Sequence, residues 1–293
     1  AVDDVSFTLD AGKTLGIVGE SGCGKTTLGR TVLRLHSNNG GEILFDGQDI
    51  NRLGKREMQG MRTRMQLIFQ DPYSSLSPRL TVGEIIGEAV SYHKVVPVSQ
   101  VREYVLDVMD QCGLQPHYYS RYPHEFSGGQ RQRICIARSL ALQPDFVVCD
   151  EPVSALDVSI QAQIINLLKK LQTEKGMAYL FISHDLSVVR HISDDVGVMY
   201  LGSMVEKGAK EDIFQKPLHP YTQALFSAVP NVDPRKKMNR IILQGDIPSP
   251  ANPPAGCKFH TRCDRCMEIC KREKPVFRDM GGEHFVACHL YNQ

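Results

Sequence analysis

The sequence has no block of like charge. Its 34 Lys and Arg side chains nearly balance 33 Asp and Glu, and no segment is a run of basic residues of the kind that follows a phosphate backbone. Nucleic acid is therefore not an expected partner. Internal repeats and low-complexity segments are also missing. A chain of 293 residues that is 42% hydrophobic is long enough for one large domain with appendages.

Long apolar runs are also absent. The longest, such as Phe146–Cys149 and Ala178–Ile182, are far shorter than the roughly 20 residues of a membrane-spanning helix. No basic-then-apolar signal segment opens the chain, which begins at Ala1 directly before a strand-like pattern in residues 2–7. We expect a trimmed N-terminus, and we expect any link to a membrane to go through another subunit.

Strand-like and helix-like segments alternate in the first third of the chain and again after residue 145. Between about Pro72 and Gln143 the pattern is helical only, over residues 83–92, 100–112 and 127–141. The sequence therefore predicts an α/β core with a largely parallel sheet and an antiparallel β edge, interrupted by a helical subdomain at about 72–143. The predicted strands are 14–18, 42–45, 65–69, 146–149, 178–182 and 196–200, and a long helix is predicted at 160–174.

Proline marks the last predicted boundary. Lys216-Pro217, His219-Pro220 and the Pro-rich segment 247–256 interrupt the regular patterns after Phe214. We expect one domain at residues 1–215 and a C-terminal extension at residues 216–293.

A phosphate-binding motif follows the first predicted core strand. Residues 19–26 fit G-x-x-x-x-G-K-S/T and open a helix. Backbone N–H groups of such a loop wrap a triphosphate, while Lys25 would bridge the β- and γ-phosphates and Thr26 would ligate Mg²⁺. A plain glycine-rich turn is the alternative. The predicted nucleotide contacts in this loop are Gly19, Glu20, Ser21, Gly22, Cys23, Gly24, Lys25, Thr26 and Thr27.

An acidic pair ends the apolar strand predicted at residues 146–149. Asp150 and Glu151 would stand at the carboxyl edge of a parallel sheet, where nucleotides bind. Asp150 would hold Mg²⁺ through water, and Glu151 would polarise the water that attacks the γ-phosphate. Capping of the following helix is an equally good explanation of the pair taken alone.

A second anion-binding pattern precedes this strand. Phe126 is followed by Ser127, Gly128, Gly129 and Gln130, a run that resembles the signature of ATP-binding cassette (ABC) proteins, usually written L-S-G-G-Q. A serine and two glycines at a helix N-terminus form an anion site. An ordinary Ser-capped helix would explain Ser127 but not the whole run.

The remaining ABC motifs follow in order, and the resemblance extends over essentially the whole chain. Gln70 resembles the Q-loop, Asp157 lies in the D-loop segment 154–157, and His184 resembles the switch histidine. The resemblance implies a P-loop NTPase of the ABC ATPase type, with Glu151, His184 and Gln70 as catalytic residues and with Thr26, Gln70 and Asp150 at Mg²⁺. It also implies a dimer, in which the signature and Asp157 meet the nucleotide or surface of the opposite subunit. The aromatic residue that stacks on adenine in this family would lie upstream of Ala1.

Cysteine is unevenly distributed. Cys23, Cys112, Cys135 and Cys149 stand singly, while five cysteines crowd into residues 257–288. Without a secretory signal, a disulfide framework is not expected, and metal or cluster ligation is favoured. Five, six and seventeen residues separate the members of a set that comprises Cys257, Cys263, Cys270 and Cys288.

This spacing, together with the upstream run His219-Pro220-Tyr221, resembles the C-terminal region of the ATPase subunits of peptide importers. The resemblance implies a four-iron, four-sulfur (4Fe-4S) cluster on the four thiolates, with a structural role rather than one in redox catalysis. Zinc and unligated thiols are the alternatives. Cys266 falls outside the pattern, and His260 and His289 could compete as ligands.

The resemblance as a whole implies the ATPase subunit of an importer for di- and oligopeptides. The expected partners are a second, related ATPase subunit, two transmembrane permease subunits and an extracytoplasmic solute-binding protein, with the chain held on the cytoplasmic face of the cell membrane. An importer of nickel, glutathione or another small solute is the nearest alternative. A soluble ABC ATPase acting on DNA or ribosomes usually carries two cassettes or a coiled-coil insertion, and a purely regulatory module would not need Lys25, Glu151 and His184.

Overall fold

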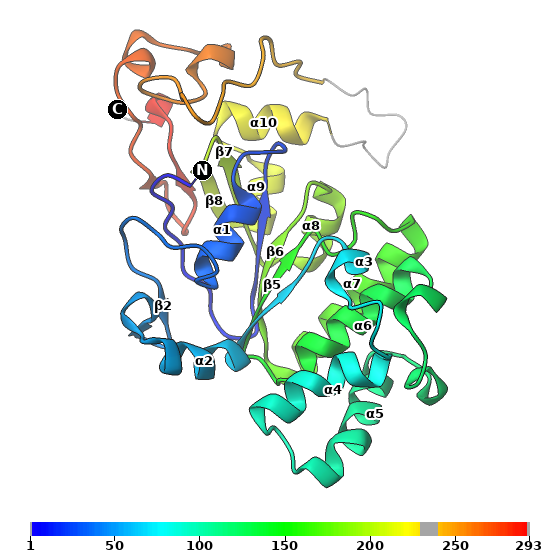
Figure 1. Ribbon diagram of the computed structural model, residues 1–293. Helices are drawn as coiled ribbons and strands as arrows, with labels where there is room; N and C mark the ends of the chain where they lie inside the picture. Colours follow the sequence, from blue (N-terminus) through cyan, green and yellow to red (C-terminus); the bar gives the residue numbers. More distant parts are fainter. Residues whose placement is uncertain (1, 229–239, 292–293) are drawn as a thin grey trace. The chain divides into compact units, whose positions relative to one another are not determined.

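The computed structural model describes residues 2–228 and 240–291 (Figure 1). The chain divides into two compact units. The helical unit comprises Asp10–Lys13 and Thr31–Leu180, and the loop unit comprises Ala1–Leu9, Thr14–Arg30 and Phe181–Gln293. In the described residues, no helix has the length and apolar character needed to cross a membrane.

The helical unit contains the strand order β4-β5-β6. Strands β4 and β5 pair in parallel from Met65 opposite Phe146 to Ile68 opposite Cys149. Every residue of β5 is buried, as expected for a parallel strand covered on both faces. The strands are β2 (Leu44–Phe45), β3 (Gln48–Asp49), β4 (Met65–Ile68), β5 (Phe146–Asp150) and β6 (Ala178–Ile182), of which β6 ends in the loop unit.

Four α-helices and three short 3-10 helices lie between β4 and β5, and no strand lies between Ile68 and Phe146 (Figure 1). Their ends carry the expected caps: Thr81 and Ser127 form capping boxes with Glu84 and Gln130. The helices of this unit are α2 (Lys55–Arg64), α3 (Pro72–Ser75), α4 (Val82–His93), α5 (Val101–Gln111), α6 (Gly128–Leu140) and α7 (Val158–Lys175). The helical segments are confirmed, while the limits of the subdomain remain a prediction.

Two predicted strands are corrected. Strand β2 covers only Leu44–Phe45, because a two-residue turn with positive φ at Asp46 and Gly47 folds it back onto the equally short β3. The strand-like pattern of residues 2–7 forms no strand. Asp4 adopts the left-handed conformation with φ 57°, which interrupts an extended ladder.

The loop unit has the strand order β1-β7-β8-β10-β9. Strand β1 pairs in parallel with β7, and the remaining neighbours pair antiparallel. The antiparallel edge expected from the sequence is therefore present, and its last two strands come from the C-terminal extension. The elements are β1 (Thr14–Val18), α1 (Lys25–Val32), α8 (Leu186–Ile192), β7 (Asp195–Tyr200), β8 (Ser203–Ala209), α9 (Lys210–Gln215), α10 (Pro220–Ser227), β9 (Arg278–Asp279) and β10 (Phe285–Val286). Helix α1 continues into the helical unit at Thr31.

A buried carboxylate joins the extension to β8. The Glu206 side chain is 0% exposed and accepts hydrogen bonds from the backbone N–H groups of Leu218 (2.7 Å) and His219 (2.9 Å). The ring nitrogen Nε2 of His284 lies 2.7 Å from the same carboxylate. Because a buried carboxylate is stable only when its oxygens are paired, this set of contacts fixes α10 and the segment before β10 against β8.

An aromatic cluster gives the extension an apolar contact with the sheet. The rings of Tyr200, Tyr221 and Phe259 lie 4.8 to 5.4 Å apart, and all three side chains are fully buried. Burial of each aromatic side chain contributes on the order of 2 kcal/mol to folding.

Candidate nucleotide-binding residues

The phosphate loop begins where β1 ends. Gly19 has φ 150°, and a Cβ atom built on it would lie 2.2 Å from the carbonyl oxygen of Met199. Only glycine therefore allows the chain to turn so closely beside β7. The rest of the loop runs over the outside of the unit, since Ser21 and Gly22 are exposed, and it is tied back by a 2.8 Å hydrogen bond from the Gly202 N–H to the Cys23 carbonyl.

Lys25 lies inside this loop. Its side chain is 5% exposed, and Nζ donates to the carbonyl oxygens of Gly19 (2.8 Å) and Glu20 (3.0 Å). The ammonium therefore already occupies the cavity of the loop, where phosphate oxygens could exchange with the two carbonyls. Burial raises the pKa of the neighbouring Cys23 thiol, so this cysteine is a neutral, inert part of the loop wall.

The other loop positions follow the expected pattern. Gly24 has φ 105°, and its carbonyl accepts from the N–H of Leu28 in the first turn of α1. Thr26 and Thr27 lie half-buried in that turn. The first N–H groups of a helix point out of its N-terminus. The backbone N–H groups in the first turn of α1 therefore point toward the phosphate loop, where they can bind an anion.

His184 lies in the same unit, directly after β6. The backbone N–H of the buried Ser183 donates to Ile17 in β1, and Ser183 Oγ accepts from the N–H of Asp185, which caps α8. These bonds fix the backbone on both sides of His184, whose side chain is exposed. The backbone that carries His184 is therefore ordered, and its role as the switch histidine remains a prediction.

In the helical unit, the predicted base and the Q-loop residue are in direct contact. Nε2 of Gln70 donates a 2.9 Å hydrogen bond to Oε2 of Glu151. Glu151 has a positive φ of 48°, which turns the chain sharply after the buried Asp150, and its carbonyl accepts from Ser154 Oγ. A non-glycine residue in this conformation is strained, and such strain is common at functional sites.

The signature residues form the start of α6. Ser127 Oγ accepts from the N–H of Gln130 (3.4 Å), and Gln130 Oε1 accepts from the N–H of Ser127 (3.0 Å). Ser127 is therefore a helix cap, as the simpler interpretation of the sequence proposed. That interpretation does not explain the two glycines.

Packing against the predicted D-loop and the first turn of α7 explains the glycines. A Cβ on Gly129 would lie 2.5 Å from Cγ2 of Ile160, and a Cβ on Gly128 would lie 3.2 Å from Cδ2 of Leu156. Asp157 caps α7 by accepting from the N–H of Ile160, and this hydrogen bond lowers the pKa of its carboxyl. The signature and the D-loop are thus one packed structure.

The cysteines of the extension lie near one another. Burial raises the pKa of Cys257 to about 12, and the charges of Cys270, Cys288 and Cys263 contribute in the same direction. The backbone N–H of Cys257 also donates to the carbonyl of Cys270 at 2.8 Å. However, no group of three or more Cys, His, Asp or Glu among the described residues is arranged to hold a metal ion. The predicted cluster, and zinc as its alternative, are therefore not confirmed.

Sequence reasoning missed the contacts between the extension and the phosphate loop. Arg262 forms a bidentate ion pair with the Glu20 carboxylate, and the Glu20 N–H donates to the hydroxyl of Tyr221. Tyr221 belongs to the run His219-Pro220-Tyr221, which was noted in the sequence analysis. No local pattern, however, links residues that lie more than 200 positions apart in the sequence.

A loop that wraps its own lysine is typical of P-loop nucleotide-binding proteins, and the Ser-Gly-Gly-Gln run at the start of α6 is the one that resembles the ABC signature. Comparisons with known proteins agree with this class. Residues 2–154 match the family described as "ABC transporter", and residues 205–270 match "Oligopeptide/dipeptide transporter, C-terminal region".

Curated relatives match along the whole chain. The oligopeptide transport ATP-binding protein AppF of Bacillus subtilis is 56% identical over 100% of this chain and 90% of its own length. The dipeptide transport ATP-binding protein DppF of Escherichia coli is 52% identical over 100% of this chain and 87% of its own length.

Solved structures share the fold. CbiO1 from Clostridium perfringens, part of the ABC transporter complex cbiONQ, matches with a TM-score of 0.68 at 27% identity, covering 74% of this chain and 84% of its own. The ADP- and Pi-bound post-hydrolysis dimer of the ATP-binding cassette MJ0796 matches with a TM-score of 0.65 at 27% identity, covering 71% and 90%. The chain belongs to the ABC transporter family, as one of its oligopeptide/dipeptide transport ATP-binding proteins. The predicted ABC ATPase fold and the ATPase class are confirmed, whereas the Cys-rich character predicted for the extension is not specifically confirmed.

Proposed function

We propose that this protein binds and hydrolyses ATP to power the uptake of di- or oligopeptides through an ABC importer. The observation that carries the ATPase part is the buried ammonium of Lys25, held by two carbonyl oxygens inside a loop built for phosphate. The match of residues 205–270 to the peptide-transporter C-terminal region, and the printed names of the relatives, support peptides as the solute.

In this proposal each predicted residue keeps its role. Backbone N–H groups of the phosphate loop and Lys25 would bind the triphosphate. Thr26, Asp150 and Gln70 would hold Mg²⁺, whose charge would offset that of the phosphates. Glu151 accepts the proton of the attacking water, and the Gln70 amide that donates to it orients its carboxylate. His184 would hydrogen-bond the γ-phosphate.

The proposed partners follow from the same family. A second ATPase subunit, related but distinct, would supply its own Ser-Gly-Gly helix start to the nucleotide, while Ser127, Gly128, Gly129, Gln130 and Asp157 of this chain would serve the partner's nucleotide. Two permease subunits would hold the pair on the cytoplasmic face of the cell membrane, and an extracytoplasmic binding protein would deliver the peptide.

The ATPase proposal is tested by measuring ATP turnover of the wild type and of Lys25→Ala, with Lys55→Ala as control. Lys55 is exposed at the start of α2, so its loss should leave turnover unchanged. Lys25→Ala should reduce turnover by a factor of 100 or more, on the order of the loss seen when a preorganised charge at a transferred phosphate is removed. Equal turnover of the two variants would contradict the proposal. The solute is tested separately, by uptake of labelled peptides in cells that carry or lack the gene.

We also propose that Cys257, Cys263, Cys270 and Cys288 hold a 4Fe-4S cluster. Four thiols are the donor set that such clusters use, and the backbone hydrogen bond from the Cys257 N–H to the Cys270 carbonyl brings two of these four residues together. Anaerobic purification should give broad absorbance near about 400 nm with about four iron and four sulfide per chain. The variant Cys270→Ser should lose most of the iron, and Cys135→Ser, at a buried cysteine of the helical unit, should not. One zinc per chain, or no metal, would contradict the cluster.

A further inference from the structure

The C-terminal extension contacts the phosphate loop mainly through one residue, Glu20. Nη1 and Nη2 of Arg262 donate to the two carboxylate oxygens of Glu20 at 2.8 and 3.1 Å. The backbone N–H of Glu20 donates to the Tyr221 hydroxyl at 2.9 Å. Both the side chain and the backbone of the second residue of the loop are therefore held by residues of the extension.

The ion pair is well shielded from water. The side chain of Arg262 is 8% exposed and that of Glu20 is 23% exposed. The guanidinium carbon also lies 5.9 Å from the ring centre of the buried Tyr200. A bidentate pair of this kind has a fixed geometry and is screened by salt less than a surface pair.

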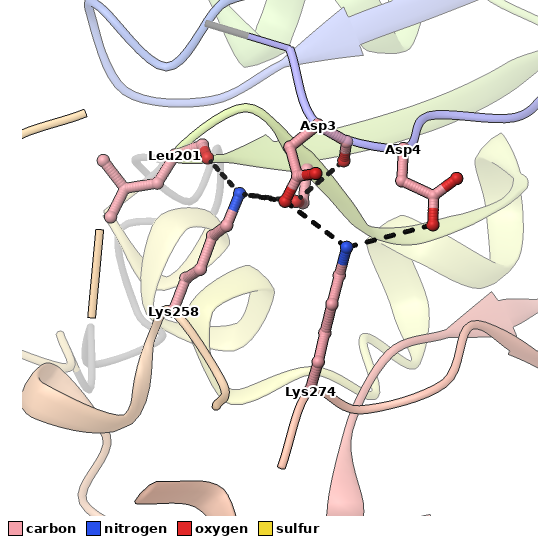
Figure 2. A network of polar contacts seen from close by, with 6 residues as sticks. Asp3, Asp4, Leu201, Lys258 and Lys274 are labelled. Atoms are coloured by element: carbon pink, nitrogen blue, oxygen red, sulfur yellow. Dashed lines mark hydrogen bonds and ion pairs between the residues drawn. The ribbon is translucent and has the colours of Figure 1, made fainter. Parts of the chain in front are cut away.

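The segment that carries Arg262 is anchored by neighbouring polar contacts. It ends the 3-10 helix His260–Arg262, a few residues after Lys258. Figure 2 shows Lys258 and Lys274 converging on Asp3, with Lys258 also donating to the carbonyl of Leu201 (2.8 Å). Leu201 adjoins Gly202, whose N–H binds the Cys23 carbonyl of the phosphate loop. The extension thus contacts the loop directly at Glu20, and it contacts the turn at Leu201 and Gly202 that holds Cys23.

A cavity of about 280 Å³ lies between the phosphate loop and the Pro-rich part of the extension. Its walls are the loop residues 20–23, the turn at Tyr200 and Leu201, and the Pro-rich residues 247–250. The extension therefore lies beside the loop without filling the space next to it.

An unpaired carboxylate in a phosphate-binding loop would repel the nucleotide. A triphosphate carries three to four negative charges, and the Glu20 side chain belongs to the loop that must receive them. Within the described residues, Arg262 forms the ion pair that neutralises this carboxylate. We propose that Arg262 is a positioning residue for the nucleotide, which neutralises and orients Glu20 so that the phosphate loop binds ATP. This inference rests on the proposed ATPase function.

The test is a double-mutant cycle on the purified protein, with Arg262→Met, Glu20→Gln and the pair combined. The readouts are the dissociation constant of a fluorescent ATP analogue and the KM and kcat of ATP hydrolysis. Arg262→Met should weaken nucleotide binding about tenfold and raise KM, with a smaller effect on kcat, because it leaves a bare carboxylate in the loop. Adding Glu20→Gln should restore affinity to within about threefold of the wild type, because the repulsive charge is gone.

The rescue separates an electrostatic role from a structural one. If Arg262 only braces the loop, the double variant binds no better than Arg262→Met, and the proposal is wrong. The loss in Arg262→Met should also shrink as salt is raised, since salt screens the repulsion. Arg262→Lys, which keeps the charge, should retain more affinity than Arg262→Met.

Matched controls keep the outcomes distinct. Arg272→Met removes an exposed arginine of the same extension and should leave affinity unchanged. If Arg262→Met behaves like Arg272→Met while the wild type binds ATP, the inference fails and the ATPase proposal stands. If the wild type and Lys25→Ala hydrolyse ATP at the same rate, the ATPase proposal itself fails. Thermal unfolding without nucleotide identifies any variant that does not fold.

Discussion

Acidification should destabilise this protein through one buried histidine. His219 is 1% exposed, and its Nδ1 accepts a 3.0 Å hydrogen bond from the N–H of Tyr221 at the start of α10. An acceptor nitrogen must be unprotonated, so protonation would remove the cap and place a charge in the core. Burial accordingly lowers the pKa of His219 to about 4, against the opposing influence of the Glu206 carboxylate.

The magnitude follows from proton linkage. The histidine of the unfolded chain binds a proton near its ordinary pKa of about 6.5, whereas the folded protein does so only near about 4. Between these values the unfolded state binds more protons, so the free energy of unfolding falls as pH falls and is unaffected by this residue above about pH 7. The loss from this group should be about 2 kcal/mol at pH 5 and about 3 kcal/mol below pH 4.

The assay is urea unfolding at pH 7.5, 6 and 5 for the wild type and His219→Asn. Asparagine caps helices well but does not titrate in this range, so it removes the linkage while keeping the cap. Other groups change ionisation as well, and only the difference in slope between the two proteins isolates His219. Parallel loss of stability in both proteins, or an NMR titration of His219 centred near pH 6.5, would refute the reasoning.

Three further predictions concern the helical unit. Glu151→Gln should abolish ATP turnover while leaving nucleotide binding intact, and should trap an ATP-bound dimer on gel filtration; normal turnover would show that another group is the base. Gly129→Ala should lower the free energy of unfolding by about 1 to 2 kcal/mol, because its Cβ would press on Ile160, and Ile160→Ala in the same chain should recover part of this loss. Strictly additive losses would show that the contact is not the cause. Burial raises the pKa of the Cys112 thiol to about 12. This thiol should therefore resist iodoacetamide at pH 8 in the native protein and react after unfolding, which mass spectrometry would detect. Rapid labelling of the native protein would contradict its burial.

Most secondary structure could be predicted because its signals are local. The apolar runs that became β1 and β6 were predicted with the correct limits, and the Ser127 cap marks the start of α6 within one residue. The wrong strand prediction also came from a local pattern. Residues 2–7 carry a strand-like pattern, but a strand also needs a partner along its length, and the left-handed Asp4 prevents one.

The sequence by itself determined the class of the protein. The loop at residues 19–26, the Asp150-Glu151 pair and the run at 127–130 are short motifs whose chemistry depends on residues that stay neighbours whatever the fold. Long-range contacts were decided only by the tertiary structure. Gln70 reaches Glu151 because parallel β4 and β5 bring their ends together, and Arg262 reaches Glu20 across a sequence separation of 242 residues because β8 and the aromatic cluster fix the extension. A charge or amide at such distances leaves no pattern in the sequence, since its partner is chosen by packing rather than by spacing.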